Sequence, residues 1–145
     1  MSTNSLVAYM DEDWKVTTSY IHYDGYIRGV GERLLETYNN KEKAYELATS
    51  LGYASSLEKS IEDSHADRGN DHEPITNENY FEFEEYIKES SHLEYVYVWV
   101  ASKNEWQVAT WDCTELHTLS EKGCDFRYDW NGFEDLNSVF IRDIS

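Results

Sequence analysis

Residues 93–100 constrain the fold of this chain more than any other stretch. They read LEYVYVWV, so valines alternate with Tyr95, Tyr97 and Trp99. Strict alternation of β-branched and aromatic residues is typical of a β-strand. The residues that follow, ASKNE and then WQVATW (106–111), predict a loop and a returning strand. We therefore expect an antiparallel hairpin here.

The aromatic residues of this strand share one face, because side chains alternate across a strand. Three roles fit Tyr95, Tyr97 and Trp99. They could pack beneath a helix, bind a protein partner as interface hot spots, or stack on a free nucleotide. The pattern alone leaves these roles open.

Helical and extended patterns also occur outside this hairpin. In 41–51 the apolar residues follow the i, i+3, i+4, i+7 spacing of an amphipathic helix, and Gly52 suits its end. We expect further helices at 30–38 and 77–90, and a helical turn begun by a capping box of Ser55 and Glu58. Further strands are expected at 6–10, 15–23 and 138–141, and a polar loop at 62–76.

The helix expected at 77–90 carries many carboxylates. Thr76 or Asn77 is the expected N-cap. With Tyr80, Phe83 and Ile87 facing inward, helical geometry places four glutamates on one outward stripe. These are Glu78, Glu82, Glu85 and Glu89.

The length of 145 residues fits one domain, which we place at 1–145. Strands near both ends with helices between them predict the α+β class. The expected architecture is an antiparallel sheet with about three helices packed on one face.

The formal net charge of −17 restricts the partners that this protein can bind. It argues against direct nucleic-acid binding and against an anionic membrane surface, since both would repel an acidic protein. Residues 51–100 carry the excess, with twelve acidic residues against Lys59, Arg68 and Lys88. A basic protein partner, or imitation of DNA, suits this charge.

Residues 20–35, YIHYDGYIRGVGERLL, form the most unusual polar cluster. Its glycines match neither the P-loop nor the dinucleotide fingerprint. A small-anion site at a glycine-rich turn and a purely architectural corner are both consistent with it. The residues concerned are Tyr20, His22, Asp24, Gly25, Tyr26, Gly29 and Gly31.

Metal and cysteine patterns predict no cofactor. The loop residues His65, Asp67, Asp71, His72 and Glu73 match no zinc or calcium spacing, and Arg68 suits an ion pair with Asp67. Cys113 and Cys124 form no CxxC pair, and reduced thiols or a disulfide both remain open. No apolar run is long enough to span a membrane, and the first residues lack a signal-peptide pattern.

A block over residues 18–70 resembles small accessory proteins of phages and mobile elements whose biochemistry is unknown. The resemblance rests on Y-x-H-x-D-G-Y at 20–26, G-x-x-L-L at 31–35, L-G-x-x-S-S-L at 51–57 and D-R-G at 67–69. Tyr23 and Ile27 depart from the tryptophan and proline of that pattern. The resemblance implies a phage protein acting in the cytoplasm of an infected bacterium, where such proteins often inhibit host defence.

Together these observations predict a non-enzymatic inhibitor of a host defence protein of the restriction, BREX or CRISPR type. The expected contact is an acidic and aromatic surface made by the four glutamates and by Tyr95, Tyr97 and Trp99. A DNA mimic of the same systems and a sponge for a nucleotide signal are the alternatives. An enzyme using His22 and Asp24 is the third class, and no nucleophile or metal accompanies that pair. The oligomeric state is open, a dimer included.

Overall fold

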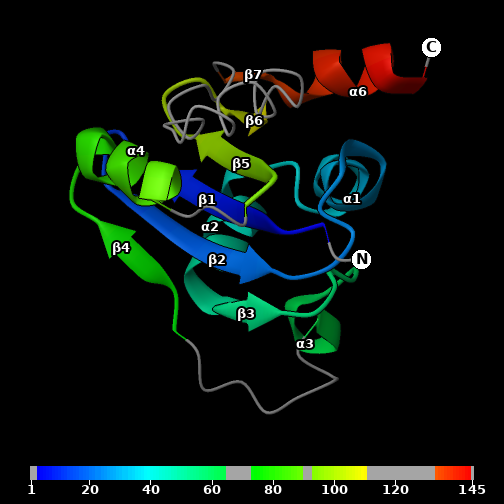
Figure 1. The fold of residues 1–145 in the computed structure, drawn as a ribbon, viewed down its shortest axis with the longest axis horizontal. Coiled ribbons are helices and arrows are strands. Elements are labelled where there is room, and N and C mark those ends of the chain that lie inside the picture. The colour runs from blue at the N-terminus through cyan, green and yellow to red at the C-terminus, as the bar shows by residue number, and fades with distance from the viewer. Residues whose placement is uncertain (1–2, 65–72, 90–92, 111–132, 145) are drawn as a thin grey trace, which may run out of the picture.

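A computed structural model of the chain describes residues 3–64, 73–89, 93–110 and 133–144. Seven strands form one twisted sheet in the order β3-β2-β1-β5-β6-β7, and β4 pairs with the same edge of β2 as β3 (Figure 1). The strands are β1 (Ser5–Met10), β2 (Val16–Ile21), β3 (Tyr53–Ala54), β4 (Ile75–Asn77), β5 (Tyr95–Val100), β6 (Glu105–Thr110) and β7 (Glu134–Asp135).

The sheet is mixed, which corrects the expected antiparallel arrangement. The central strand β1 pairs antiparallel with β2 but parallel with β5, so Ala8 lies between Thr18 and Val98. The short β3 also runs parallel to β2. Parallel neighbours require a long crossover connection, and here the chain between β2 and β5 supplies it with helices. The predicted hairpin is confirmed as β5 and β6.

Helices cover both faces of the sheet rather than the one face expected (Figure 1). The described helices are the π-helix η1 (Ile27–Gly31), α1 (Glu32–Thr37), α2 (Lys41–Ser50), α3 (Ile61–Ser64), α4 (Tyr80–Glu89) and α6 (Leu136–Ile144). The α+β class is therefore confirmed, whereas five α-helices replace the expected three. None of those described is long and apolar enough to cross a membrane.

Two separate cores explain the two-sided arrangement. One core lies under η1, α1, α2 and α6, where Leu34 and Leu47 meet the aromatic side chains of β5 and β6. The other lies under α4, where Phe83 and Ile87 pack on Leu6 and other apolar residues of the strands. Both faces of β1 and β5 are thus apolar, and one layer of helices would leave half of that surface in water.

Three local predictions were wrong. Residues 138–141 belong to α6 rather than to a strand, because Leu136, Val139 and Phe140 pack on the core at helical spacing. The N-cap of α4 is Asn79, whose side chain accepts the Glu82 N–H at 2.9 Å, while Thr76 and Asn77 lie in β4.

The third concerns the helical turn expected from Ser55 and Glu58. The short helix α3 begins only at Ile61. The hydroxyl of Ser60, the residue before it, accepts the Asp63 N–H at 3.0 Å. Residues 53–54 form β3, which pattern analysis missed. The predicted loop at 62–76 holds the end of α3 and most of β4, and its residues 65–72 lie outside the described ranges.

The second helix is confirmed almost residue for residue as α2. Asn40 caps it by accepting the Lys43 N–H at 2.9 Å, and Ala44, Leu47 and Ala48 are fully buried. Beyond its end Gly52 takes a φ of 71°, the left-handed conformation expected of a glycine that ends a helix.

Candidate functional site

The segment 20–35 forms the corner where β2 passes into η1 and α1, and it separates His22 from Asp24. The Nδ1 atom of His22 lies 2.9 Å from the Tyr20 hydroxyl. The Asp24 carboxylate instead accepts the hydroxyl of Tyr26 at 3.3 Å. Each member of the predicted pair therefore has an aromatic hydroxyl as its partner.

The backbone of this corner satisfies its own hydrogen bonds. The N–H groups of Gly29 and Gly31 donate to the Tyr26 carbonyl, and that of Val30 donates to the Asp24 carbonyl. An anion held by these three N–H groups, as the glycine-rich turn suggested, would have to displace carbonyls already in place. The corner is also tied to the sheet, because the Tyr97 hydroxyl donates to the Gly25 carbonyl at 2.6 Å.

Two tyrosines at this corner, the half-buried Tyr20 and the buried Tyr38, make folding sensitive to alkali. Burial raises the pKa of Tyr20 and that of Tyr38 to about 12. An unfolded tyrosine ionises near pH 10, so above that value the unfolded chain loses its proton first. We predict that the two tyrosines contribute their complete stabilisation below about pH 10. The free energy of unfolding then falls as the pH rises toward 12.

Urea unfolding at a series of alkaline pH values measures this fall. Tyr20→Phe and Tyr38→Phe should each make the curve shallower, because a phenylalanine has no proton to lose. An equally steep decline in the wild type and both variants would assign the effect to other groups.

The aromatic face of β5 packs inward, the first of the three roles that its pattern left open. Tyr97 is 0% exposed and Trp99 is 1% exposed. Trp99 meets Trp106 edge-to-face at 5.7 Å, and Tyr95 is half-buried beside Tyr97. Tyr97 and Trp99 therefore offer no surface to a partner.

The four predicted glutamates lie together along α4 and at its start. Glu78, Glu82 and Glu89 are exposed and Glu85 is half-exposed. One of them has a structural role, because the Glu82 carboxylate accepts the backbone N–H of Glu78 at 3.0 Å. A carboxylate at this position also stabilises the helix, because its negative charge interacts favourably with the positive end of the helix dipole.

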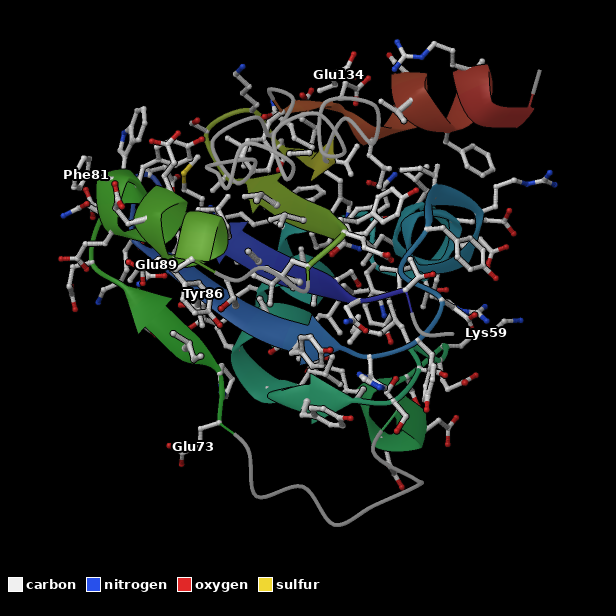
Figure 2. The ribbon with its side chains drawn as sticks, in the orientation of Figure 1. Lys59, Glu73, Phe81, Tyr86, Glu89 and Glu134 are labelled. Atoms are coloured by element: carbon white, nitrogen blue, oxygen red, sulfur yellow. The ribbon has the colours of Figure 1, made fainter. Side chains whose placement is uncertain are left out.

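Two exposed aromatic side chains lie on α4 or against it, and neither was predicted from the sequence. Phe81 is 69% exposed and, on its helix, lies three and four residues from Glu84 and Glu85; Figure 2 shows it directed away from the sheet. Trp14 is 58% exposed in the β1–β2 turn and meets Tyr80 of α4 edge-to-face at 6.1 Å. The sequence contains one sign of this for Phe81, which does not lie on the apolar side of its helix. We call the set Trp14, Glu78, Phe81, Glu82, Glu85 and Glu89 the α4 surface.

An apolar cavity of about 310 Å³ adjoins the α4 surface at Trp14 and Tyr80. Its other apolar lining comes from Met10, Val98, Val100 and Phe133, so strands β1 and β5 form its floor. The turn that presents Trp14 is held by Asp11, whose carboxylate accepts the N–H groups of Asp13 and Lys15. Trp14 therefore stands at the rim of the cavity on a braced turn, with a φ of 69°.

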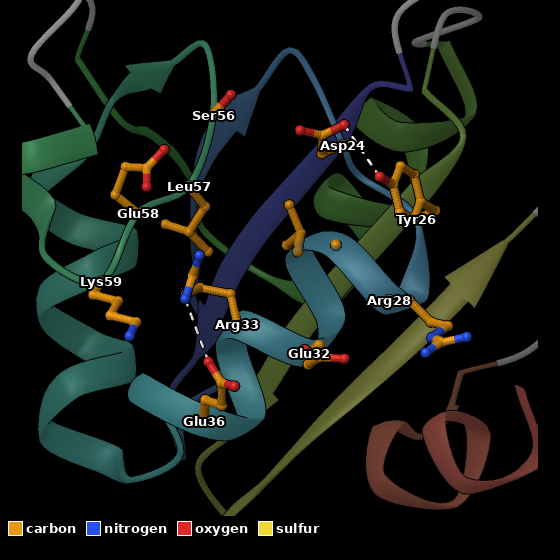
Figure 3. A pocket seen from close by; sticks show the side chains of 12 residues that line it. Asp24, Tyr26, Arg28, Glu32, Arg33, Glu36, Ser56, Leu57, Glu58 and Lys59 are labelled. Carbon is orange, nitrogen blue, oxygen red and sulfur yellow. Dashed lines mark hydrogen bonds and ion pairs between the residues drawn. The ribbon is translucent and has the colours of Figure 1, made fainter. Parts of the chain in front are cut away.

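A second, polar groove of about 430 Å³ lies between the corner and the segment 56–59 (Figure 3). The residues that line it are Asp24, Tyr26, Arg28, Gly29, Val30, Glu32, Arg33, Glu36, Ser56, Leu57, Glu58 and Lys59. Sequence analysis did not predict this groove, because only the fold brings the two segments together.

The other residues considered in the sequence lie outside the described ranges. These are His65, Asp67, Arg68, Asp71, His72, Cys113 and Cys124. Glu73, at the edge of that gap, is exposed. Within the described ranges, no three His, Cys, Asp or Glu side chains form a group able to hold a metal ion.

Comparison with known proteins identifies no relative. No family model, no curated protein and no solved structure matches this chain.

Proposed function

We propose that this protein is a non-enzymatic inhibitor that binds a basic protein of a host defence system through the α4 surface. The observation that carries the proposal is the pair of exposed aromatic side chains at α4: Trp14 lines an apolar cavity together with Tyr80, and Phe81 lies on the helix that carries most of the glutamates. Tryptophan and other aromatic residues supply much of the binding energy at protein interfaces, above all where a pocket accompanies them.

The charge supports a partner of the opposite sign. Residues 73–89 contain six glutamates and one basic residue, Lys88. Carboxylates around an apolar centre steer a basic surface toward it and suppress contacts with acidic ones. The sheet-side residues of α4 are already buried, whereas Phe81, Glu82 and Glu89 of the same helix are exposed.

The aromatic side chains favour specific docking over imitation of DNA. A mimic needs regularly spaced negative charge, and an exposed phenylalanine has no counterpart in a phosphate backbone. Direct binding of nucleic acid is disfavoured by the same negative charge. The proposed partner therefore need not be a DNA-binding channel.

The resemblance of residues 18–70 to phage accessory proteins supplies the proposed context. In that context the partner is a restriction, BREX-type or CRISPR-type protein in the cytoplasm of the infected bacterium. The nucleotide-sponge alternative concerns the polar groove rather than the α4 surface.

Affinity purification from bacteria that carry such defence systems tests the proposal, followed by titration of the captured protein. Phe81→Ser should weaken its binding about tenfold or more, since hot-spot side chains contribute about 2 kcal/mol or more. Tyr45→Ser is the matched control, because Tyr45 is also 54% exposed but lies on α2, on the opposite face of the sheet. Equal weakening by both variants, or by neither, would contradict binding through the α4 surface.

A further inference from the structure

The polar groove beside the corner gathers three basic side chains among four carboxylates, in a chain that is strongly acidic as a whole. Three of the twelve basic residues, Arg28, Arg33 and Lys59, line it. Of its four carboxylates, Glu36 already pairs with the Nη1 atom of Arg33 at 3.3 Å. Among the described residues, the other two cations, Arg28 and Lys59, have no carboxylate partner.

One of these groups is a buried donor that no protein atom satisfies. The Nε atom of Arg33 is buried and has no acceptor among the described residues, although the same guanidinium bonds Glu36 through Nη1. Burying a charged donor without an acceptor costs about 1–3 kcal/mol or more.

The second cation approaches from the opposite wall. Figure 3 shows Lys59 extending toward the middle of the groove, with Arg33 across from it. Neither Lys59 nor Arg28 forms an ion pair within the part of the chain that the structure describes. Asp24, the second of the four carboxylates, accepts the Tyr26 hydroxyl. Within the described ranges, the carboxylates of Glu32 and Glu58 form no ion pair.

The walls of the groove are fixed by hydrogen bonds before any ligand arrives. The Glu58 carbonyl accepts the Tyr38 hydroxyl, and the Glu58 N–H donates to the Ser64 hydroxyl, each at 2.9 Å. The facing wall is η1, held by the Val30 N–H on the Asp24 carbonyl. Short π-helical turns occur frequently at functional sites, and a preformed site loses less entropy when it binds.

We propose that this groove binds a small phosphate monoester, with the phosphate between Arg33 and Lys59 and the rest of the ligand along Tyr26 and Ser56. A doubly charged phosphate suits two cations better than a single carboxylate does, and arginine and lysine are its usual ligands. The volume of about 430 Å³ falls within the range of small-molecule sites, and the 43% exposed Tyr26 ring can cover a sugar or a base. This inference does not rest on the proposed inhibitor function.

Calorimetric titration with adenosine monophosphate, ribose 5-phosphate and adenosine tests the proposal. The two phosphates should bind, and adenosine should bind at least tenfold more weakly because it lacks the charged group. Absence of binding by both phosphates, or equal binding of adenosine, would overturn the proposal.

Two variants place the phosphate in the groove. Lys59→Gln removes an exposed charge, and Arg33→Lys keeps the charge but replaces the planar guanidinium that can donate two hydrogen bonds to a phosphate. Each should weaken phosphate binding about tenfold. Lys43→Gln, on the exposed side of α2, is the matched control and should change nothing. Unchanged affinity in both groove variants would place the ligand elsewhere, and neither variant alters the α4 surface.

Discussion

Gly25→Ala and Gly29→Ala should each lower the free energy of unfolding by about 3 kcal/mol, because a methyl group at either position overlaps fixed backbone. A Cβ atom at Gly25 would lie 2.7 Å from the Thr3 carbonyl oxygen and 2.8 Å from the Cβ atom of Ser5. At Gly29 it would collide with the Asp24 carbonyl oxygen, which accepts the Val30 N–H. Neither neighbour is the mobile end of a side chain, so the backbone itself must move.

Gly31→Ala is the internal control for this pair. There a Cβ atom would meet only the side chains of Leu136 and Tyr97, at 3.3 Å. Because side chains can shift by a few tenths of an ångström, we expect a loss of about 1 kcal/mol or less. Urea unfolding followed by circular dichroism measures all three variants. Equal stability of the Gly25 and Gly29 variants with the wild type would show that close packing does not hold this corner.

These glycines explain why the structure of residues 20–35 could be predicted only in part from the sequence. Glycines in a turn commonly supply a left-handed φ. The left-handed residue here is instead Asp24, with a φ of 60°, and no left-handed φ occurs at Gly25, Gly29 or Gly31. Their small size serves close approach instead. A contact with Thr3 or Leu136 depends on distant parts of the chain, which local turn rules cannot supply.

Helices and strands whose apolar residues recur at a regular spacing could be predicted from the sequence. Features that depend on contacts between residues far apart in the chain could not. The alternation in 93–100 and the helical spacing in 41–51 each predicted the right element, since the pattern and the buried face coincide. Residues 138–141, SVFI, have the composition of a strand, but a window of four residues hides the helical spacing of Leu136, Val139 and Phe140. The parallel pairing of β1 with β5 has no local signal at all.

The two candidate sites also differ in how far they could be predicted from the sequence. The glutamates of the α4 surface were predictable, because one helix carries most of them and its apolar side fixes their direction. Trp14 joins that surface only through its contact with Tyr80. The polar groove needs η1 beside the segment 56–59, and the hydrogen bond from Tyr38 to Glu58 that holds them is made across twenty residues.

Reversing charge on the α4 surface should slow association with the captured partner, and strongly at low salt. The variant Glu78→Lys, Glu85→Lys, Glu89→Lys removes three carboxylates of that surface and leaves Glu82, whose carboxylate supports the start of α4. Long-range attraction between opposite charges raises association rates by about 10- to 1,000-fold. We therefore expect an association rate at least about tenfold lower, while the unfolding midpoint stays close to that of the wild type.

A second triple variant controls for the change in net charge. Glu42→Lys, Glu46→Lys, Glu62→Lys alters the total by the same amount at exposed positions on α2 and α3, away from α4 (Figure 1). Since charges more than about 10 Å apart are largely screened at 0.1 M salt, a distant reversal should matter little there. A loss confined to the first variant would assign the effect to the α4 surface.

The measurement that tests the proposed inhibitor function most directly is the association rate constant of the captured partner with these three proteins across a salt series. Docking through the α4 surface predicts a steep fall with salt for the wild type, a slow and nearly salt-independent rate for the α4 variant, and wild-type behaviour for the control at 0.1 M salt and above. Equal rates for the wild type and the α4 variant at low salt would contradict it, because the carboxylates of α4 would then be solvated surface with no part in binding.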